Sequence, residues 1–152
     1  MESLERILHE HPFFATFSSE HLKVLTGCTK NHRFAAGDYL CRQGAPAHEF
    51  FLIRHGRVAL EIAAPGKTPI IFETIGDGDI AGASWLVPPY RWNFDARALQ
   101  LTRAIGLDAD CLRGKCDADP QLGYHMMKTF LPILVNRLQA ARLQILDVYG
   151  RN

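Results

Sequence analysis

The chain has 152 residues, of which 47% are apolar, 22% charged and 10% aromatic, a composition typical of globular proteins and not of disordered or fibrous ones. Lys and Arg total 17 and Asp and Glu total 16, so the formal net charge of +1 provides no overall basic field to attract nucleic acid or anionic lipid. No apolar stretch approaches the ~20 residues that cross a bilayer, and residues 1–6 lack the apolar run of a secretory signal. We therefore predict one cytoplasmic domain over residues 1–152, without a membrane segment.

The cysteines, Cys28, Cys41, Cys111 and Cys116, form no CxxC pair, and a chain of this length does not need a disulfide framework. We therefore expect four reduced thiols. A zinc site built from Cys28, His32 and Cys41 is the metal alternative, but it lacks the paired-ligand spacing of structural zinc sites, so no metal is predicted.

Helices are predicted in residues 1–30, where apolar residues recur at helical spacing. The first helix is expected to begin near Ser3 and to be interrupted at His11, because the residue before a proline avoids the helical region. Ser18 or Ser19 is a suitable N-cap for the second helix.

Residues 31–108 change to a period of two, which is typical of half-buried strands. Glycine or proline separates the short apolar runs, and Pro65-Gly66 predicts a turn that reverses the chain. Short strands without alternating helices indicate a small sandwich or barrel and not a doubly wound sheet. The predicted strands are Tyr39–Arg42, Phe50–Ile53, Val58–Ile62, Ile70–Ile75, Asp79–Gly82, Phe94–Ala98 and Arg103–Leu107.

The helical period returns in residues 109–149. Asp108 and Asp110 are expected to cap a short helix, and Pro120 suits the first turn of a long one. Pro132 lies inside the long helix and has no N–H for the carbonyl four residues back, so we expect a kink there.

Apolar residues of the long helix follow a 4-3 spacing, which makes a continuous stripe over about three heptads. We expect the first half of the stripe to pack on the strands and the second half to pair with a helix of a second copy. The stripe consists of Met127, Leu131, Leu134, Leu138, Ala141, Ile145 and Val148, of which the last four are assigned to the dimer.

The sequence motifs of common enzymes do not occur. There is no His-x-His of the metal-dependent jelly-roll enzymes, Ser84 does not lie in a Gly-x-Ser-x-Gly elbow, and no Walker loop or dinucleotide fingerprint is found. We therefore predict a protein without catalytic activity. The informative stretch is residues 75–86, where a Gly-Asp-Gly turn precedes Gly82 and exposed backbone N–H groups are suited to bind a phosphate or carboxylate.

Three glycine-punctuated segments carry the most specific signal: Phe34-x-x-Gly37-Asp38-x-Leu40-x-x-x-Gly44, Phe50-Phe51-Leu52-Ile53-x-x-Gly56-x-Val58 and Ile75-Gly76-x-Gly78-Asp79-Ile80-x-Gly82. Together with the helices at both ends, they resemble the cyclic nucleotide-binding domain of the catabolite-activator superfamily over nearly the whole chain. The resemblance implies a mainly β fold with flanking helices: a double-stranded β-helix, or jelly roll, in residues 31–108. It also implies a phosphate-binding cassette in residues 76–98 and a final long helix that pairs across a dimer.

The cassette departs from the family pattern. In the family, a glutamate after a glycine holds the ribose 2′-hydroxyl, and an arginine before Ser or Thr pairs with the cyclic phosphate. Aligned without gaps, Gly82 matches the glycine, Ala83 takes the glutamate position, Trp92 the arginine position and Asn93 the Ser or Thr position. Loss of the arginine alone is expected to weaken phosphate binding by roughly ten- to a hundredfold.

Arg91 is adjacent to the lost arginine, but neighbours on an extended segment point to opposite sides. With Arg91 inward the cassette binds an anion, whereas with Trp92 inward the pocket is plugged or suits an apolar or aromatic ligand. Trp85 and Trp92 then either pack in a core or stack on a flat ring. The candidate ligand residues are Gly82, Ala83, Ser84, Trp85, Arg91, Trp92 and Asn93.

These features predict a small-molecule sensing module whose ligand is cAMP, cGMP or another small anion, bound weakly or in a rewired way. The alternative is a ligand-free dimerisation or protein-interaction module that keeps the fold. A redox or haem sensor that uses Cys or His is the third hypothesis. Direct DNA binding is not expected, because no helix-turn-helix follows the long helix in this sequence.

Overall fold

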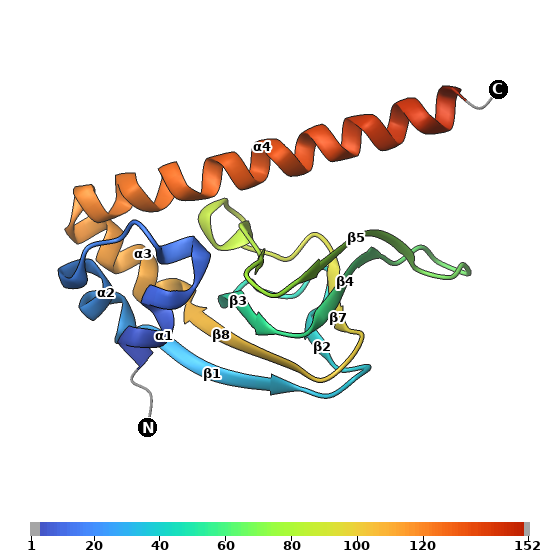
Figure 1. The fold of residues 1–152 in the computed structure, drawn as a ribbon. Coiled ribbons are helices and arrows are strands. Elements are labelled where there is room, and N and C mark those ends of the chain that lie inside the picture. Colours follow the sequence, from blue (N-terminus) through green and yellow to red (C-terminus); the bar gives the residue numbers. More distant parts are fainter. Residues whose placement is uncertain (1–3, 151–152) are drawn as a thin grey trace.

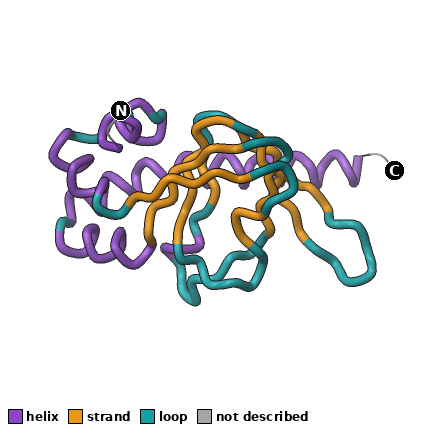
Figure 2. The backbone as a smooth tube through the Cα atoms, turned by 90° about the horizontal axis from the view of Figure 1, so that it is seen from below, coloured by secondary structure: helices purple, strands orange, loops and turns teal. Residues whose placement is uncertain are grey.

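The computed structural model describes residues 4–150, so the predicted helix start at Ser3 lies outside the described residues. Two four-stranded antiparallel sheets form a roll, short helices gather at one end, and one long helix runs across the top (Figure 1). Figure 2 shows the same division, with the short helices and the strands at opposite ends. The predicted mainly β jelly roll with a long C-terminal helix is confirmed. None of the helices in the described residues is long and apolar enough to cross a membrane.

The helices begin and end where their capping residues predict. α1 ends at Glu10, just before the His11-Pro12 step. The Ser18 hydroxyl caps α2 by accepting a hydrogen bond from the His21 N–H at 3.2 Å, and the Asp108 carboxylate caps α3 by accepting one from the Cys111 N–H at 2.8 Å. The helices are α1 (Leu4–Glu10), η1 (Pro12–Phe14), α2 (Ser19–Thr26), η2 (Ser84–Leu86), α3 (Ala109–Ala118) and α4 (Pro120–Gly150).

The strands form one sheet with the order β1-β8-β3-β6 and a second with the order β2-β7-β4-β5. β1 was not predicted, because its sequence is mostly polar and Phe34 is its single large apolar residue. It is held as an edge strand by continuous antiparallel pairing with β8. The strands are β1 (Thr29–Phe34), β2 (Tyr39–Cys41), β3 (Glu49–His55), β4 (Arg57–Ile62), β5 (Ile70–Gly76), β6 (Ile80–Ala81), β7 (Asp95–Ala98) and β8 (Thr102–Asp108).

Two apolar cores lie on opposite sides of the first sheet. Phe50 and Phe51 are neighbours on β3, so their side chains point to opposite faces, one into each core. The helix-side core contains Phe50 with Phe13, Phe14, Leu22, Trp85, Leu107, Leu112, Leu122, Met126 and Phe130. The roll core, between the two sheets, contains Phe51 with Ile53, Val58, Leu60, Ile75, Trp92, Ala96 and Ala104.

The prediction of four reduced thiols is wrong, because Cys28 and Cys111 form a disulfide with their Cα atoms 5.6 Å apart. The pairing of β1 with β8 brings these residues together although 83 positions separate them in sequence. Cys28 is therefore not a thiolate ligand, and His32 instead pairs with Glu49 at 2.9 Å, so the zinc alternative does not hold. Over residues 4–150, no group of three or more His, Cys, Asp or Glu is placed to hold a metal.

α4 is one continuous helix of 31 residues that contains Pro132, where a kink was expected, and Figure 1 shows this helix without a break. Pro132 lies on the exposed side, where water can bond to the carbonyl that it leaves unpaired. The first half of the apolar stripe does not pack on the strands as predicted: Leu131 is 60% exposed. The helix instead turns Met126 and Phe130 into the helix-side core, because the aromatic rings there offer the larger contact.

His11 links the N-terminal helices to the roll through both ring nitrogens. Its Nδ1 accepts a hydrogen bond from the Phe13 N–H at 3.2 Å, so Nε2 carries the proton and donates to the Ile53 carbonyl at 3.2 Å. Burial lowers the pKa of His11, although the Ile53 carbonyl and the Asp79 carboxylate oppose this shift. The buried imidazole is therefore neutral at pH 7.

We expect this histidine to make the fold less stable in acid. The unfolded chain binds the proton more tightly than the fold, so the stability is complete above about pH 6.5 and is lost as the pH falls below that value. The slope from this group is at most about 1.4 kcal/mol per pH unit. Urea unfolding at pH 7.5 and 5.5 checks this, with His11→Asn as the variant, since asparagine keeps the cap on Phe13. If the free energy of unfolding fell by the same amount between pH 7.5 and pH 5.5 in both proteins, His11 would not be the group responsible.

Candidate functional site

The cassette begins with a turn that joins β5 to β6. Gly78 adopts φ +83° there and donates its N–H to the Ile53 carbonyl at 3.0 Å, while the Asp79 carboxylate accepts from the Gly76 N–H at 2.9 Å. β6 pairs with β3, and Gly82, at φ +107°, then turns the chain into η2. The turn and the small-residue segment therefore lie where the sequence predicted them.

Trp92, and not Arg91, faces the interior of the roll. Trp92 is 5% exposed and its ring stacks on Phe51 with the centroids 6.2 Å apart, while Phe94 meets its edge at 5.7 Å. Arg91 is exposed and donates from Nη1 to the Gly44 carbonyl at 2.8 Å on the outside. Of the two orientations considered from the sequence, the structure has the one in which an indole fills the roll.

Gly82 and Trp92 fit against each other. A Cβ at position 82 would lie 2.5 Å from Cη2 of Trp92 and 2.6 Å from Cζ3, distances that side-chain carbons essentially never show. The positive φ of Gly82 is a second reason for glycine there. In this chain the glycine therefore leaves room for the chain's own tryptophan.

The other predicted ligand residues lie elsewhere. Trp85 is buried in the helix-side core, stacked on Phe50 with centroids 5.4 Å apart, and its indole N–H has no acceptor among the described residues. Ala83 and Ser84 are half-buried beside it, and Asn93 is exposed. The two tryptophans are thus on opposite sides of the first sheet and do not form one aromatic ligand box.

Two acidic residues that the sequence analysis missed lie opposite each other on the outer face of β4 and β7. Glu61 is buried and accepts hydrogen bonds from Nε and Nη2 of Arg97 at 2.9 and 3.3 Å. This hydrogen bond and the charge of Glu61 raise the pKa of Arg97. Asp95 accepts from the Gln43 N–H at 2.7 Å, and Arg42 lies 3.6 Å away. Because Ala96 faces the roll core, Arg97 points outward and cannot replace the lost arginine inside.

Few polar or charged side chains are buried in the described part of the chain. Over residues 4–150, the buried polar or charged side chains are His11, Glu61, Asp95 and Thr102, and none is a lysine or arginine. The opening near Trp92 is a pocket of about 200 Å³, which Arg42, His48 and Glu49 help to line. Arg42 already packs over the Tyr39 ring at 3.9 Å. An arginine-held phosphate, as the sequence resemblance implied, therefore has no counterpart in the described interior.

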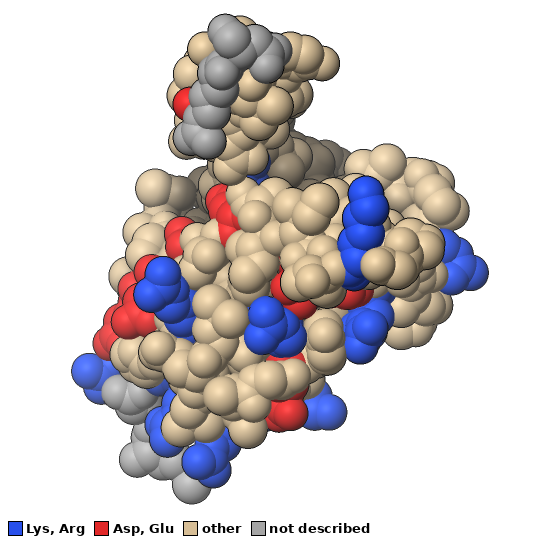
Figure 3. All heavy atoms as spheres, turned by 90° about the vertical axis from the view of Figure 1, so that its right-hand side faces the viewer, with Lys and Arg blue, Asp and Glu red and all other residues tan. Residues whose placement is uncertain are grey.

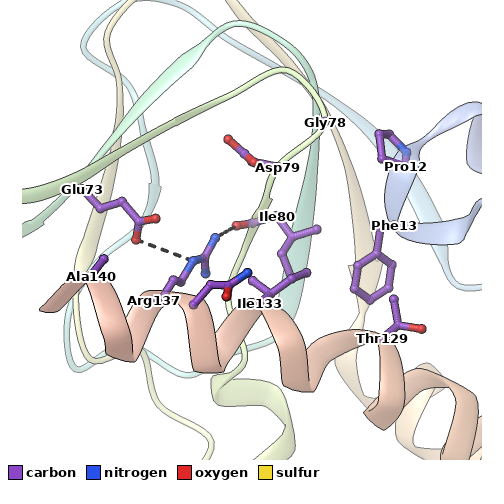
Figure 4. Close-up of a pocket in the computed structure, with 11 residues that line it drawn as sticks. Pro12, Phe13, Glu73, Gly78, Asp79, Ile80, Thr129, Ile133, Arg137 and Ala140 are labelled. Atoms are coloured by element: carbon purple, nitrogen blue, oxygen red, sulfur yellow. Dashed lines mark hydrogen bonds and ion pairs between the residues drawn. The ribbon is translucent and has the colours of Figure 1, made fainter. Parts of the chain in front are cut away.

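A second hollow separates α4 from the roll. It has a volume of about 450 Å³, and Arg137 crosses it from the helix (Figure 4). Nε of Arg137 lies 3.5 Å from the Glu73 carboxylate, and Nη2 donates to the Ile80 carbonyl. Further along the helix, Gln144 donates to the Phe72 carbonyl at 3.0 Å. α4 is therefore attached to β5 and, through Ile80, to β6 inside the cassette.

Comparison with known proteins decides the family. The model of the cyclic nucleotide-binding domain matches residues 31–119, which is more than half of the chain. The chain belongs to the cyclic nucleotide-binding domain family. Similar solved structures include a candidate cyclic nucleotide-binding protein from Geobacter metallireducens, at 25% identity and TM-score 0.79, covering 91% of this chain and 99% of that one.

Two further structures share the fold of this cyclic nucleotide-binding domain. A cyclic nucleotide-binding domain from Methylobacillus flagellatus is 22% identical with a TM-score of 0.78, covering 95% of this chain and 81% of that one. The catabolite activator protein from Thermus thermophilus is 20% identical with a TM-score of 0.71, covering 91% of this chain and 63% of that one. The family membership that the glycine spacing indicated is confirmed.

Proposed function

We propose that this cyclic nucleotide-binding domain is a cytoplasmic, non-catalytic regulatory module that holds no cyclic nucleotide in its roll and acts through self-association of α4. The observation that carries the proposal is the inward Trp92, whose indole stacks on Phe51 in the roll core. The position that would supply an arginine is thus taken by an apolar ring, and Ala83 supplies no carboxylate. This is the ligand-free alternative that the sequence left open.

The exposed stripe of α4 supports a second copy as the partner. Leu138 is 52% and Ile145 55% exposed, and Ala141 and Val148 continue the same face. The 4-3 spacing suits a helix pair, and a two-fold axis lets one stripe cover the same stripe of the other copy. Figure 3 shows charges of both signs scattered over the body, whereas the projecting end of α4 is mostly uncharged.

Two contacts connect the cassette to this helix. Phe130 of α4 packs on Trp85 of η2, with their centroids 5.7 Å apart, and Arg137 bonds to the carbonyl of Ile80. These contacts lie on both sides of Gly82 in the sequence. A change in the conformation of the cassette would therefore be transmitted to α4. In the proposed function this link keeps the helix in one position, as Trp92 does not leave the roll.

Calorimetric titration with cAMP and cGMP, combined with sedimentation equilibrium, tests the proposal. We expect no heat up to about millimolar nucleotide, and a dimer whose dissociation constant is the same with and without nucleotide. Micromolar binding that is lost in Arg91→Ala would instead establish a rewired sensor. A wild-type protein that stays monomeric would contradict the self-association part alone.

A further inference from the structure

The Cys28–Cys111 disulfide ties the N-terminal helices to the helix that precedes α4. Cys28 follows α2 and is buried, whereas Cys111, in the first turn of α3, is partly exposed. The backbone supports the same junction, since the Asp108 N–H donates to the Cys28 carbonyl at 2.8 Å. The fold thus holds the two sulfurs together, and Cys111 is the more exposed residue of the pair.

α3 also holds the cassette. Arg113, two positions after Cys111, donates from Nη1 to the Trp85 carbonyl at 2.6 Å, and its guanidinium lies 4.2 Å from the centroid of the Tyr90 ring. Asp110 pairs with the same guanidinium and fixes its direction. α3 is therefore a short helix that carries the disulfide at Cys111 and the cassette contact at Arg113, two residues further on.

The two remaining cysteines are poor competitors for the disulfide partners. Burial raises the pKa of Cys41 to about 12 and that of Cys116 to about 11. Both are therefore protonated thiols at neutral pH, and the thiolate is the nucleophile in disulfide exchange. The Cys28–Cys111 pair is also the only disulfide among the described residues.

We propose that the Cys28–Cys111 pair is a reversible redox switch that sets how firmly α3 holds the cassette. In a reducing compartment, disulfides that form are usually transient and redox-sensing. The redox-sensing role of this pair therefore rests on the proposed cytoplasmic location. The structural support for the switch is the position of the Cys28–Cys111 pair and of Arg113 on α3. This support does not depend on whether the roll binds a nucleotide or whether the protein dimerises.

Glutathione is the co-reactant that balances the step. To close the switch, the Cys111 thiolate attacks glutathione disulfide and releases one glutathione thiolate; the Cys28 thiolate then attacks Sγ of Cys111 and releases the second. Two protein thiols lose two protons and two electrons, and one glutathione disulfide becomes two glutathione thiols. Opening is the reverse, with reduced glutathione attacking Sγ of Cys111, the more exposed residue of the pair.

The first test equilibrates the folded protein in glutathione buffers from fully oxidised to fully reduced, followed by acid quench, alkylation and mass spectrometry. The proposal expects the Cys28–Cys111 link to form in oxidised buffer and to open in reduced buffer without denaturant, equally in wild type and Cys116→Ser. A link that never forms, or that resists reduced glutathione until the protein unfolds, would overturn it.

The second test measures hydrogen exchange of the amides in α3 and in the cassette. Opening the link in wild-type protein is expected to speed exchange in α3 on the order of tenfold, and to speed exchange in η2, with β4 and β7 unchanged. Cys28→Ser should show the same exchange rates as the reduced wild-type protein. Arg113→Ala should speed hydrogen exchange of the amides in η2 but not of those in α3. Unchanged exchange in α3 would overturn the proposal, while the nucleotide titration judges the proposed function separately.

Discussion

Trp92→Ala is expected to lower the free energy of unfolding by about 3–5 kcal/mol, because it removes a large buried ring and leaves a void in the roll core. The void would be bordered by Phe51 and Phe94, whose rings cannot both relax into the space of an indole while the strands hold their registers. Urea unfolding followed by circular dichroism measures the loss. Arg91→Ala, one residue away on the outside, is the matched control and should change stability by less than about 0.5 kcal/mol.

The same variant predicts chemical rescue. The space that the indole leaves beside Phe51 and Phe94 should take up free indole, so indole should raise the melting temperature of Trp92→Ala and leave wild type unchanged. Equal stability of Trp92→Ala and wild type, or equal stabilisation of both by indole, would show that Trp92 does not fill the roll.

A double-mutant cycle locates the contact. Gly82→Ala should destabilise wild type, because its Cβ meets the Trp92 ring and because φ at position 82 is +107°. The strain from φ remains when Trp92 is removed, but the clash does not. The loss caused by Gly82→Ala should therefore be smaller by about 1 kcal/mol or more in the Trp92→Ala background.

If α4 self-associates as proposed, Leu138→Glu is expected to convert the proposed dimer to a monomer, raising its dissociation constant by about a hundredfold or more. Leu138 is at the centre of the stripe and is half exposed in the single chain, so the carboxylate leaves the fold intact but would be buried and unpaired in a helix pair. Sedimentation equilibrium at several concentrations measures the change.

Gln139→Glu is the control for this variant, because it adds the same charge to the next residue of α4, away from the stripe. It should dimerise as wild type does. If both variants dimerise like wild type, or if both weaken the dimer equally, the stripe is not the interface.

The alternation of apolar residues and the glycine spacing were sufficient to predict most of the roll. β4 was predicted to within one residue because Val58 and Leu60, which face the roll core, alternate with Ala59 and Glu61. The strand is not half-buried as predicted, since Ala59 and Glu61 are buried and Ile62 is exposed. The caps of α2 and α3 were also readable, since an Asp or Ser before a helix has few other roles. β1 was not, because its polar sequence lacks apolar alternation and the backbone ladder with β8 holds it in place.

The candidate site depends on which residues point into the core. A periodic pattern shows that neighbouring side chains point to opposite faces, but it does not show which of them is inside. The alternation rule showed that Arg91 and Trp92 point opposite ways, but only the shape of Gly82 and Phe51 decides which is inside. The apolar stripe of α4 was found, yet the aromatic core selected Phe130 for contact instead. The disulfide likewise required the register of β1 on β8.

The indole of Trp92 occupies the roll, and we expect it to stay there when nucleotide is added. Nuclear Overhauser contacts between the Trp92 ring and the α-protons of Gly82, recorded with and without saturating cAMP, test it most directly. The contacts should be strong in the free protein and unchanged by the nucleotide. Their absence in the free protein, or their loss when cAMP is added, would contradict the account.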